Sequence, residues 1–182
     1  MPMAQRKTRT LIKCSDKNSL RYWTKAKNPL IVALNYIIIA ICRILPSLSL
    51  KCWLLRRIGV KLGNNVSFGL ESTLDIFFPE LIEIGNNSII GFNTVILAHE
   101  FLIDELRVGE VRIGKNVTIG ANCTILPGVE IGDNSIISAH SLVNSDIPPN
   151  VLAGGVPARV IKKLGMQKSP TNKTLHQQNA DS

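Results

Sequence analysis

Aromatic residues are scarce in this 182-residue sequence, at 5% of the chain, and charged residues amount to only 19%. Apolar residues reach 45%, and most of them are Ile, Leu and Val. This composition excludes a largely disordered chain, and it favours a sheet-rich core over a helical bundle. The length suits one compact domain with extensions.

Cysteines are few and far apart, and no CxxC pair occurs; the four are Cys14, Cys42, Cys52 and Cys123. This spacing argues against a disulfide framework and against a structural zinc site. We therefore expect a reducing, cytoplasmic environment. Cys123 is interpreted as a small, buried apolar residue.

Acidic residues are almost absent from the first third of the chain. Residues 1–62 hold 13 Lys and Arg against the single acid Asp16, a net charge of +12, whereas residues 63–182 carry a net charge of −4. Such an asymmetry indicates contact with an anionic surface. Aromatic residues are not interleaved with the basic ones and no zinc-finger spacing occurs, so we expect a membrane surface rather than nucleic acid.

The sequence also lacks an apolar run of the length expected of a spanning helix. The longest run, residues 30–45, falls short of the roughly 18 residues required. A signal peptide fits poorly, because a long polar stretch precedes the run and no A-x-A-like site follows it. We predict a basic flexible arm over residues 1–28 and two short helices, hinged at Pro46, within the apolar segment 29–57.

Two interpretations of these helices remain open. They could pack on the body of their own domain or of a neighbouring subunit. Alternatively, residues 1–57 could form a peripheral membrane contact, with an interfacial helix whose basic side chains meet lipid phosphates while Trp53 lies at the headgroup level. The basic side chains in question are Arg43, Lys51, Arg56 and Arg57.

From Leu62 onward the sequence repeats every six residues. The blocks IGKNVT, IGANCT, ILPGVE, IGDNSI, ISAHSL and VNSDIP place an aliphatic residue at every sixth position from Ile113 to Val143. The same phase occurs over residues 62–74 and, after a four-residue slip, over residues 84–96. Neither helical periodicity nor simple alternation gives this spacing, whereas a coil of three short strands does. We predict about 18 residues per coil and a ladder of inward-pointing aliphatic side chains.

These blocks resemble the hexapeptide signature of the left-handed parallel β-helix acyltransferases. The segment 113–164, with its closing motif DIPPNVLAGGVPARVI, closely resembles the C-terminal half of the galactoside, maltose and nodulation O-acetyltransferases. The resemblance covers residues 58–164 and not the N-terminal 57. It implies an all-β fold: a left-handed parallel β-helix over residues 58–165, with N-terminal helices and a short C-terminal helix. The polar residues 166–182 are predicted to form a disordered tail.

The resemblance also implies a catalytic base. The family histidine stands in a T-G-H-P-like stretch before a loop that interrupts the repeats, and here the hexads stop at His99, before a loop of residues 100–112. A neutral imidazole would take the proton of an acceptor hydroxyl as its oxygen attacks a thioester, and would then protonate the leaving thiolate. An isolated histidine at a coil corner would be structural, but the loop and the family match favour catalysis.

Such a base needs a partner on its other ring nitrogen. Asp75, Glu80 and Asp104 are the candidates, and the sequence does not choose among them. The acceptor-binding Asn and Asp of the family do not align with LESTLDIFFPELIEIG, which leaves the acceptor open. His140 is interpreted as a surface residue, and His176 lies in the predicted tail.

For acetyl-CoA, or another acyl-CoA, as co-substrate, the resemblance implies two pairs of residues. Ala121 and Ala139 lie on successive coils, where small residues let the pantetheine arm approach, and Arg159 and Lys162 would meet the nucleotide phosphates. The last two could instead belong to a solvated helix face. A Thr-Lys pair common in the family is replaced by residues 144–145, Asn-Ser, so one cation contact is missing or is supplied elsewhere.

The main hypothesis is therefore an acyl-CoA-dependent O-acyltransferase that modifies a hydroxyl of a sugar or related small-molecule or glycan acceptor. The resemblance implies a homotrimer with active sites between neighbouring β-helices. Three alternatives remain: an N-acyltransferase on an amino sugar or amine, a metal enzyme resembling β-helical carbonic anhydrases, and a non-catalytic β-helix assembly protein. Only three histidines occur, which disfavours the metal site, and no resident metal or nucleic-acid partner is expected.

Overall fold

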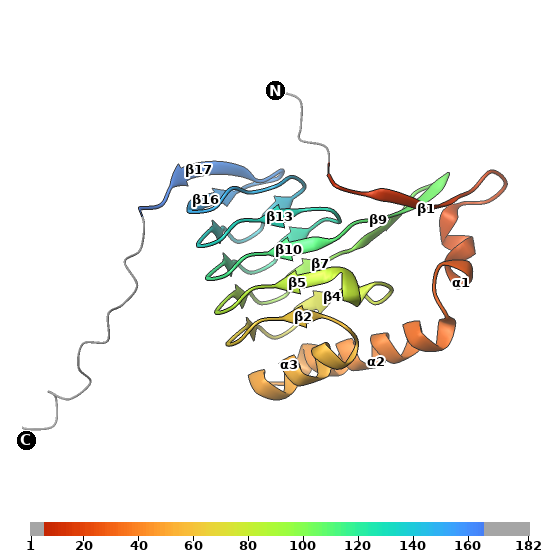
Figure 1. Cartoon of the computed structure of the whole chain (residues 1–182), viewed down its shortest axis with the longest axis horizontal. Coiled ribbons are helices and arrows are strands. Elements are labelled where there is room, and N and C mark those ends of the chain that lie inside the picture. Colours follow the sequence, from red (N-terminus) through yellow and green to blue (C-terminus); the bar gives the residue numbers. More distant parts are fainter. Residues whose placement is uncertain (1–5, 166–182) are drawn as a thin grey trace, which may run out of the picture.

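The computed structural model describes residues 6–165, which form a three-sided parallel β-helix closed at its N-terminal end by helices (Figure 1). The predicted tail at 166–182, with His176, lies outside the described residues, as do residues 1–5.

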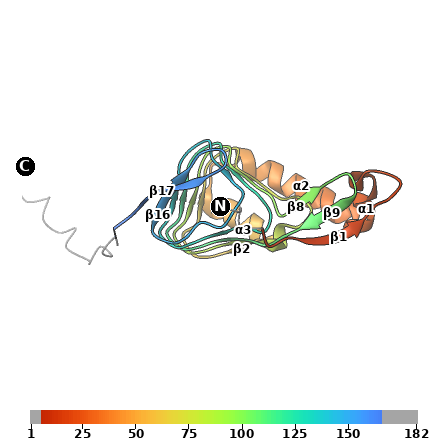
Figure 2. The ribbon, with the colours of Figure 1, turned by 90° about the horizontal axis from the view of Figure 1, so that it is seen from above.

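Three flat sheets form the sides of a prism, and each turn of the chain around it is one coil. The first side holds β2 (Lys61–Leu62), β5 (Ile82–Ile84), β10 (Val111–Ile113) and β13 (Glu130–Ile131). The second side holds β3 (Ser67–Phe68), β6 (Ile89–Ile90), β11 (Thr118–Ile119), β14 (Ile136–Ile137), β16 (Val151–Gly154) and β17 (Arg159–Lys163). The third side holds β4 (Thr73–Leu74), β7 (Val95–Ile96), β12 (Thr124–Ile125) and β15 (Leu142–Val143). Figure 2 shows the coils stacked along one axis.

The predicted aliphatic ladder is confirmed. On the first side Ile84, Ile113 and Ile131 stand in register in adjacent strands, and none is more than 2% exposed. The other two sides repeat this arrangement at Phe68, Ile90, Ile119 and Ile137 and at Leu74, Ile96, Ile125 and Val143. Because each fully buried side chain of this size contributes about 1.5–3 kcal/mol, the ladder is the main source of stability of the stack.

Asparagines at the corners explain why the hexads carry Asn so often. Asn87, Asn116 and Asn134 all have positive φ angles, between 55° and 59°, a conformation that Asn adopts more readily than most residues. Their side chains join the coils: the Nδ2 of Asn87 donates to Asn116 at 2.9 Å, and the Nδ2 of Asn116 donates to Asn134 at 3.0 Å. His140 takes the corresponding place above Asn122 in a second ladder, with φ 58°, and it is exposed, which confirms its predicted surface location.

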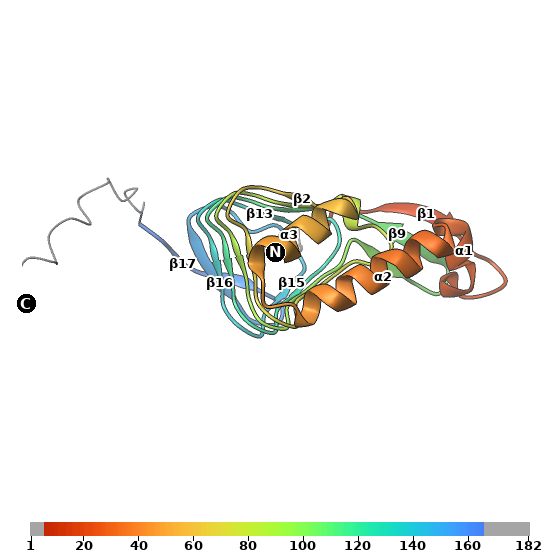
Figure 3. The ribbon, with the colours of Figure 1, turned by 90° about the horizontal axis from the view of Figure 1, so that it is seen from below.

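Helix α3 (Leu48–Arg57) lies across the N-terminal end of the prism, and α2 (Pro29–Ile44) runs beside it toward α1, as Figure 3 shows from below. Their separation at Pro46 agrees with the predicted hinge. Lys51 of α3 is 1% exposed, and its ammonium donates to the carbonyl oxygens of Phe68 and Gly69, both at 3.2 Å. These bonds cover carbonyls at the open end of the first coil, and burial lowers the pKa of Lys51. Packing on the domain is thus confirmed for the inner face of the helices.

Within the described residues no single helix is long and apolar enough to cross a membrane. One bent pair, residues 19–26 with residues 29–44 at 96° to each other, has the length and composition of a span when the two are taken together.

The flexible arm predicted over residues 1–28 is wrong for most of its described part. β1 (Arg9–Lys13) pairs antiparallel with β9 (Glu105–Val108), and η1 (Ser19–Tyr22) and α1 (Trp23–Ala26) follow it. Backbone pairing at an open strand edge depends little on side-chain polarity, which is why composition pointed to an unstructured arm. An ion pair between Arg6 and Glu100, at 2.7 Å, holds the start of the segment.

Two further expectations differ from the structure. The interruption at residues 100–112 is a β-hairpin rather than an irregular loop, because β8 (His99–Phe101) pairs antiparallel with β9. The short C-terminal helix is wrong: β17 turns back antiparallel onto β16. Five residues are too few for a stable isolated helix, whereas the edge of β16 offers unpaired backbone groups.

Candidate active site

His99 stands where the chain leaves the prism. The third side of the second coil ends at Ile96, Ala98 is fully buried, and His99 opens β8 opposite Val108 of β9. The hairpin projects from the β-helix together with β1 (Figure 2). The histidine therefore lies at the junction between a rigid coil and a projecting sheet, and its side chain is 13% exposed.

Asp75 is the carboxylate that holds this histidine. Its Oδ2 lies 2.5 Å from Nδ1 of His99 and accepts the backbone N–H of Ala98 at 2.7 Å. Its Oδ1 accepts the N–H groups of Phe77 and Phe78 at 2.8 and 2.9 Å, the turn that an Asp readily forms with residues just after it. The side chain of Asp75 is completely buried, so four hydrogen bonds replace its lost hydration.

These contacts indicate which ring nitrogen of His99 carries the proton that Asp75 accepts. Burial alone would raise the pKa of Asp75, but the hydrogen bond and charge of His99, with the N–H groups of Phe78 and Ala98, outweigh it and leave that pKa below its ordinary value. An ionised carboxylate only accepts hydrogen bonds, so Nδ1 of His99 must carry the proton that it donates. In the neutral ring, Nε2 then carries a lone pair, and within residues 6–165 no hydrogen bond engages it.

Three phenylalanines surround the imidazole. The ring centroids of Phe77, Phe78 and Phe101 lie 4.8, 6.0 and 4.9 Å from that of His99, all in edge-on arrangements. Trp23 of α1 packs on Phe77 at 6.1 Å, which adds an N-terminal residue to the cluster. Such a cluster excludes water and restricts the ring, as a preorganised base requires.

The other two candidate partners of His99 lie elsewhere. Glu80 of η2 (Pro79–Leu81) forms an ion pair with Lys27 at 2.5 Å. Asp104 is exposed in the turn of the hairpin, where its carbonyl accepts the N–H of Cys14. Of the three predicted carboxylates, only Asp75 contacts the imidazole in the described chain.

The predicted coenzyme residues form a separate group. Ala121 and Ala139 follow β11 and β14, at the corner between the second and third sides; there Gly120 packs against the backbone of Ala139 so closely that an added Cβ would lie 2.5 Å from its nitrogen. Arg159 and Lys162 are exposed on β17. Figures 1 and 2 both place β17 across the β-helix from the β8–β9 hairpin.

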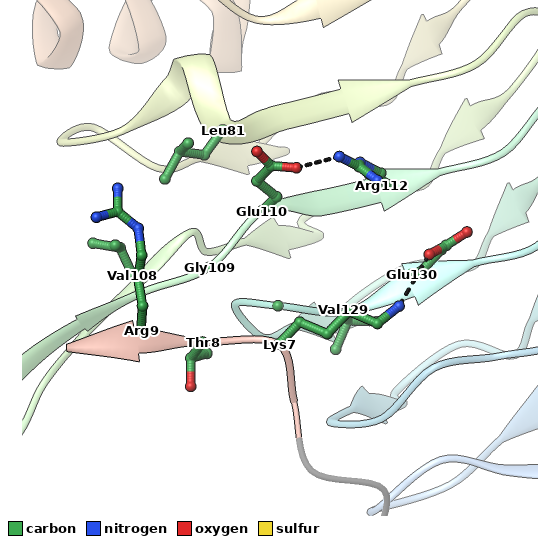
Figure 4. A pocket seen from close by; sticks show the side chains of 11 residues that line it. Lys7, Thr8, Arg9, Leu81, Val108, Gly109, Glu110, Arg112, Val129 and Glu130 are labelled. Atoms are coloured by element: carbon green, nitrogen blue, oxygen red, sulfur yellow. Dashed lines mark hydrogen bonds and ion pairs between the residues drawn. The ribbon is translucent and has the colours of Figure 1, made fainter. Parts of the chain in front are cut away.

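A cavity of about 360 Å³ lies where the N-terminal segment crosses the first side (Figure 4). Lys7 reaches Glu130 across it at 3.2 Å, and Arg112 reaches Glu110 at 2.5 Å, so its charges are largely paired. Neither His99 nor Asp75 lines this cavity, and it is distinct from the catalytic candidates. Within residues 6–165, no three His, Cys, Asp or Glu side chains gather closely enough to hold a metal ion.

Sequence reasoning missed two parts of the site, the aromatic cluster and the strand β1. The cluster could have been suspected from the sequence, because Phe is rare in this chain and two of its five Phe residues are adjacent. Phe77, Phe78 and Phe101 all contact the ring of His99. β1 left only the short apolar pair Leu11 and Ile12 within a basic segment.

The three-sided β-helix of hexapeptide repeats indicates the class of β-helical acyltransferases, and comparison with known proteins tests this assignment. Two family models match: the bacterial transferase hexapeptide (six repeats) at residues 110–145, and the hexapeptide repeat of succinyl-transferase at residues 59–98. The Bacillus subtilis (strain 168) protein named "Putative acetyltransferase YvoF" is 49% identical over 148 residues, 81% of this chain and 86% of the relative. Galactoside O-acetyltransferase of Escherichia coli (strain K12) is 37% identical over 125 residues, 63% of this chain and 62% of the relative.

Solved structures agree with these relatives. A galactoside acetyltransferase in complex with coenzyme A matches with a TM-score of 0.61 and 28% identity, over 75% of this chain and 82% of the other. A maltose O-acetyltransferase from Clostridium difficile 630 matches with a TM-score of 0.53 and 27% identity, over 76% and 90%. The chain belongs to the hexapeptide-repeat acetyltransferases, a family of enzymes, and its predicted left-handed parallel β-helix is confirmed.

Proposed function

We propose that the protein transfers an acetyl group from acetyl-CoA to a hydroxyl of a sugar or related acceptor, with His99 as general base. The observation that carries this proposal is the buried Asp75, which binds Nδ1 of His99 and leaves Nε2 for a proton. The similarity to galactoside and maltose O-acetyltransferases supports a hydroxylated acceptor.

The reaction balances without a covalent enzyme intermediate. Nε2 of His99 accepts the hydroxyl proton as the acceptor oxygen forms a bond to the thioester carbonyl carbon. The C–S bond of the resulting tetrahedral intermediate then breaks, and the sulfur leaves with the proton that Nε2 returns. Asp75 stabilises the imidazolium between the two steps and keeps Nε2 directed at the acceptor, as the carboxylate of a catalytic triad does.

For the co-substrate, we assign the pantetheine arm to the corner at Ala121 and Ala139 and the phosphates to Arg159 and Lys162. β17 lies across the prism from the hairpin. Within one chain, the proposed phosphate-binding residues are therefore far from the proposed base. A homotrimer would resolve this separation, since each His99 could then meet the coenzyme groove of a neighbour. Light scattering should give a mass about three times 20.0 kDa, and a monomer that turns over would contradict the shared site.

Replacing His99 by alanine tests the catalytic role. With acetyl-CoA and a panel of sugars, thiol release should fall by about 10²–10⁴-fold in kcat while coenzyme binding persists. His140→Ala is the matched control, because His140 is an exposed histidine beside the presumed coenzyme corner but away from the hairpin junction, and it should keep most activity.

Two outcomes would contradict the proposal. An active His99→Ala enzyme would show that another group removes the proton. If amino sugars or amines were acetylated in place of hydroxyls, the enzyme would be an N-acetyltransferase that uses the same base.

A further inference from the structure

Helix α2 has two apolar faces, and the β-helix covers only one of them. Val32, Ile39 and Cys42 are buried on the inner face, where Asn35 also donates to the carbonyl oxygen of Ile76 at 2.9 Å. The outer face carries large aliphatic side chains that are 46–80% exposed: Leu30, Leu34, Ile37, Ile41 and Ile44. At 100° per residue these five fall on one stripe roughly opposite the buried positions.

The fold directs this stripe away from the rest of the molecule. Figures 1 and 3 show α2 at the N-terminal end of the molecule, running from the prism toward α1 on the hairpin side and roughly perpendicular to the stacking axis. Since its inner face contacts the first coil, its outer face points along that axis, out of the N-terminal end. Contiguous exposed apolar surface of this kind marks an interaction site in a folded protein.

The charge around the stripe identifies the occupant. Residues 17–70 contain nine Lys and Arg and no Asp or Glu. Lys51 is buried, and Lys27 and Arg43 pair with Glu80 and Glu71, so the other six supply the excess positive charge. On α3, beside α2, Trp53 is half exposed and the guanidinium of Arg57 lies over its ring at 4.8 Å. Cations beside an apolar stripe, with Trp at the boundary, match the headgroup and acyl layers of an anionic membrane.

A second copy of the chain fits this surface less well. Neighbours in a closed ring meet side by side, so they do not cover a face that points along the axis of the prism. Two molecules stacked end to end would bring two basic surfaces together, and their repulsion opposes the contact. Rotational symmetry would instead present every α2 of a ring on the same side, which suits a flat partner.

We propose that the N-terminal end of the molecule binds the surface of a lipid bilayer that contains anionic lipids. The outer stripe of α2 inserts at the boundary between headgroups and acyl chains, and basic side chains such as Arg57 contact phosphates. The protein lies on the bilayer without spanning it, and the prism extends away from the lipid.

Flotation of the full chain with vesicles tests this binding. The protein should float with phosphatidylcholine vesicles that contain phosphatidylglycerol, float less with pure phosphatidylcholine, and lose binding as salt screens the cations. The triple variant Leu34→Ser, Ile37→Ser and Ile41→Ser should reduce partitioning by at least about tenfold, since three apolar side chains no longer insert.

The chain offers a matched control for composition. Ile89→Ser, Leu102→Ser and Ile103→Ser also remove one Leu and two Ile, all exposed but away from the N-terminal end, and this variant should bind as wild type. Full-length protein that stays unbound to anionic vesicles at low salt would overturn the proposal, as would a triple α2 variant that floats normally. A lower oligomeric mass of the α2 variant in light scattering would show that the stripe covers another copy, and would also overturn it.

Discussion

Asp75→Asn is the change that separates a positioned catalytic base from a structural histidine. The amide keeps the shape of the side chain, and its oxygen can still accept the N–H groups of Phe77 and Phe78. The amide nitrogen, however, replaces the oxygen that accepts from Ala98 and His99. It faces a backbone donor on one side and must donate to Nδ1 on the other, so the imidazole proton moves to Nε2.

The size of the effect follows from these four contacts. The N–H of Ala98 loses its acceptor in a buried position, which costs about 1–3 kcal/mol, and a charge-assisted bond becomes a neutral one. We expect a loss of roughly 2–4 kcal/mol in the free energy of unfolding, a fall in Tm on the order of 10 °C. Because Nε2 then carries a proton and cannot accept one, kcat should fall by about 10²–10⁴-fold, with little change in the KM for acetyl-CoA.

Steady-state kinetics and thermal unfolding of Asp75→Asn, His99→Ala and the double variant measure both effects. In the His99→Ala background the Asp75 change should cost little further kcat, since the two residues act as a unit. Asp104→Asn, the same acid-to-amide change at an exposed carboxylate in the hairpin turn, is the control. Wild-type kcat in a thermally weakened Asp75→Asn enzyme would refute the reasoning and reduce Asp75 to a structural role.

The pH dependence of stability has a definite sign. The pKa of Asp75 in the folded protein lies below its ordinary value of 3.8, so its contribution to stability is present above that value. The contribution is lost as the pH falls toward the folded pKa. The stability difference between wild type and Asp75→Asn should therefore shrink in acid unfolding experiments below about pH 3.8.

Two other predictions concern the coenzyme and the thiols. Replacing Arg159 and Lys162 together by alanine should weaken coenzyme A binding by about 1–3 kcal/mol and raise the KM for the acyl donor, with little change for the acceptor; equal changes in both would point to another site. Alkylation of the native protein at mildly alkaline pH should label Cys14 first, because burial raises the pKa of Cys42 to about 11 and also raises those of Cys52 and Cys123. Equal labelling of all four cysteines in the native protein would contradict this packing.

The hexad repeat made the body of the fold predictable, because every coil must bury the same inward position. The phase from Ile113 to Val143 located the ladder correctly, and the break at His99 located the start of the hairpin. At the C-terminus the same reasoning failed: β17 is an edge strand with every side chain exposed, so no burial pattern distinguishes it from a helix.

The partner of His99 could not be chosen from sequence because coil stacking decides it. Asp75 and His99 are 24 residues apart, close to one coil plus the extra residues around η2, so the stack brings them to the same corner. Glu80 and Asp104 are nearer in sequence but lie on segments directed elsewhere. Sequence separation alone does not choose the partner. It becomes informative only when the four residues that break the hexad phase after β4 are known to lie around η2.

The N-terminal third of the chain contributes to the candidate site, although it lies outside the family resemblance that the sequence offered. Trp23 packs on Phe77, the ammonium of Lys27 lies 5.2 Å from the ring centroid of Phe78, and Arg6 binds Glu100, the residue next to His99. These contacts come from the same segment that continues into α2 at the N-terminal end of the prism. One continuous stretch of chain thus supports the walls around the imidazole and carries the exposed apolar stripe. Binding at the outer face of α2 therefore has a short route to the histidine. Only the helix α1 and the aromatic cluster lie between them.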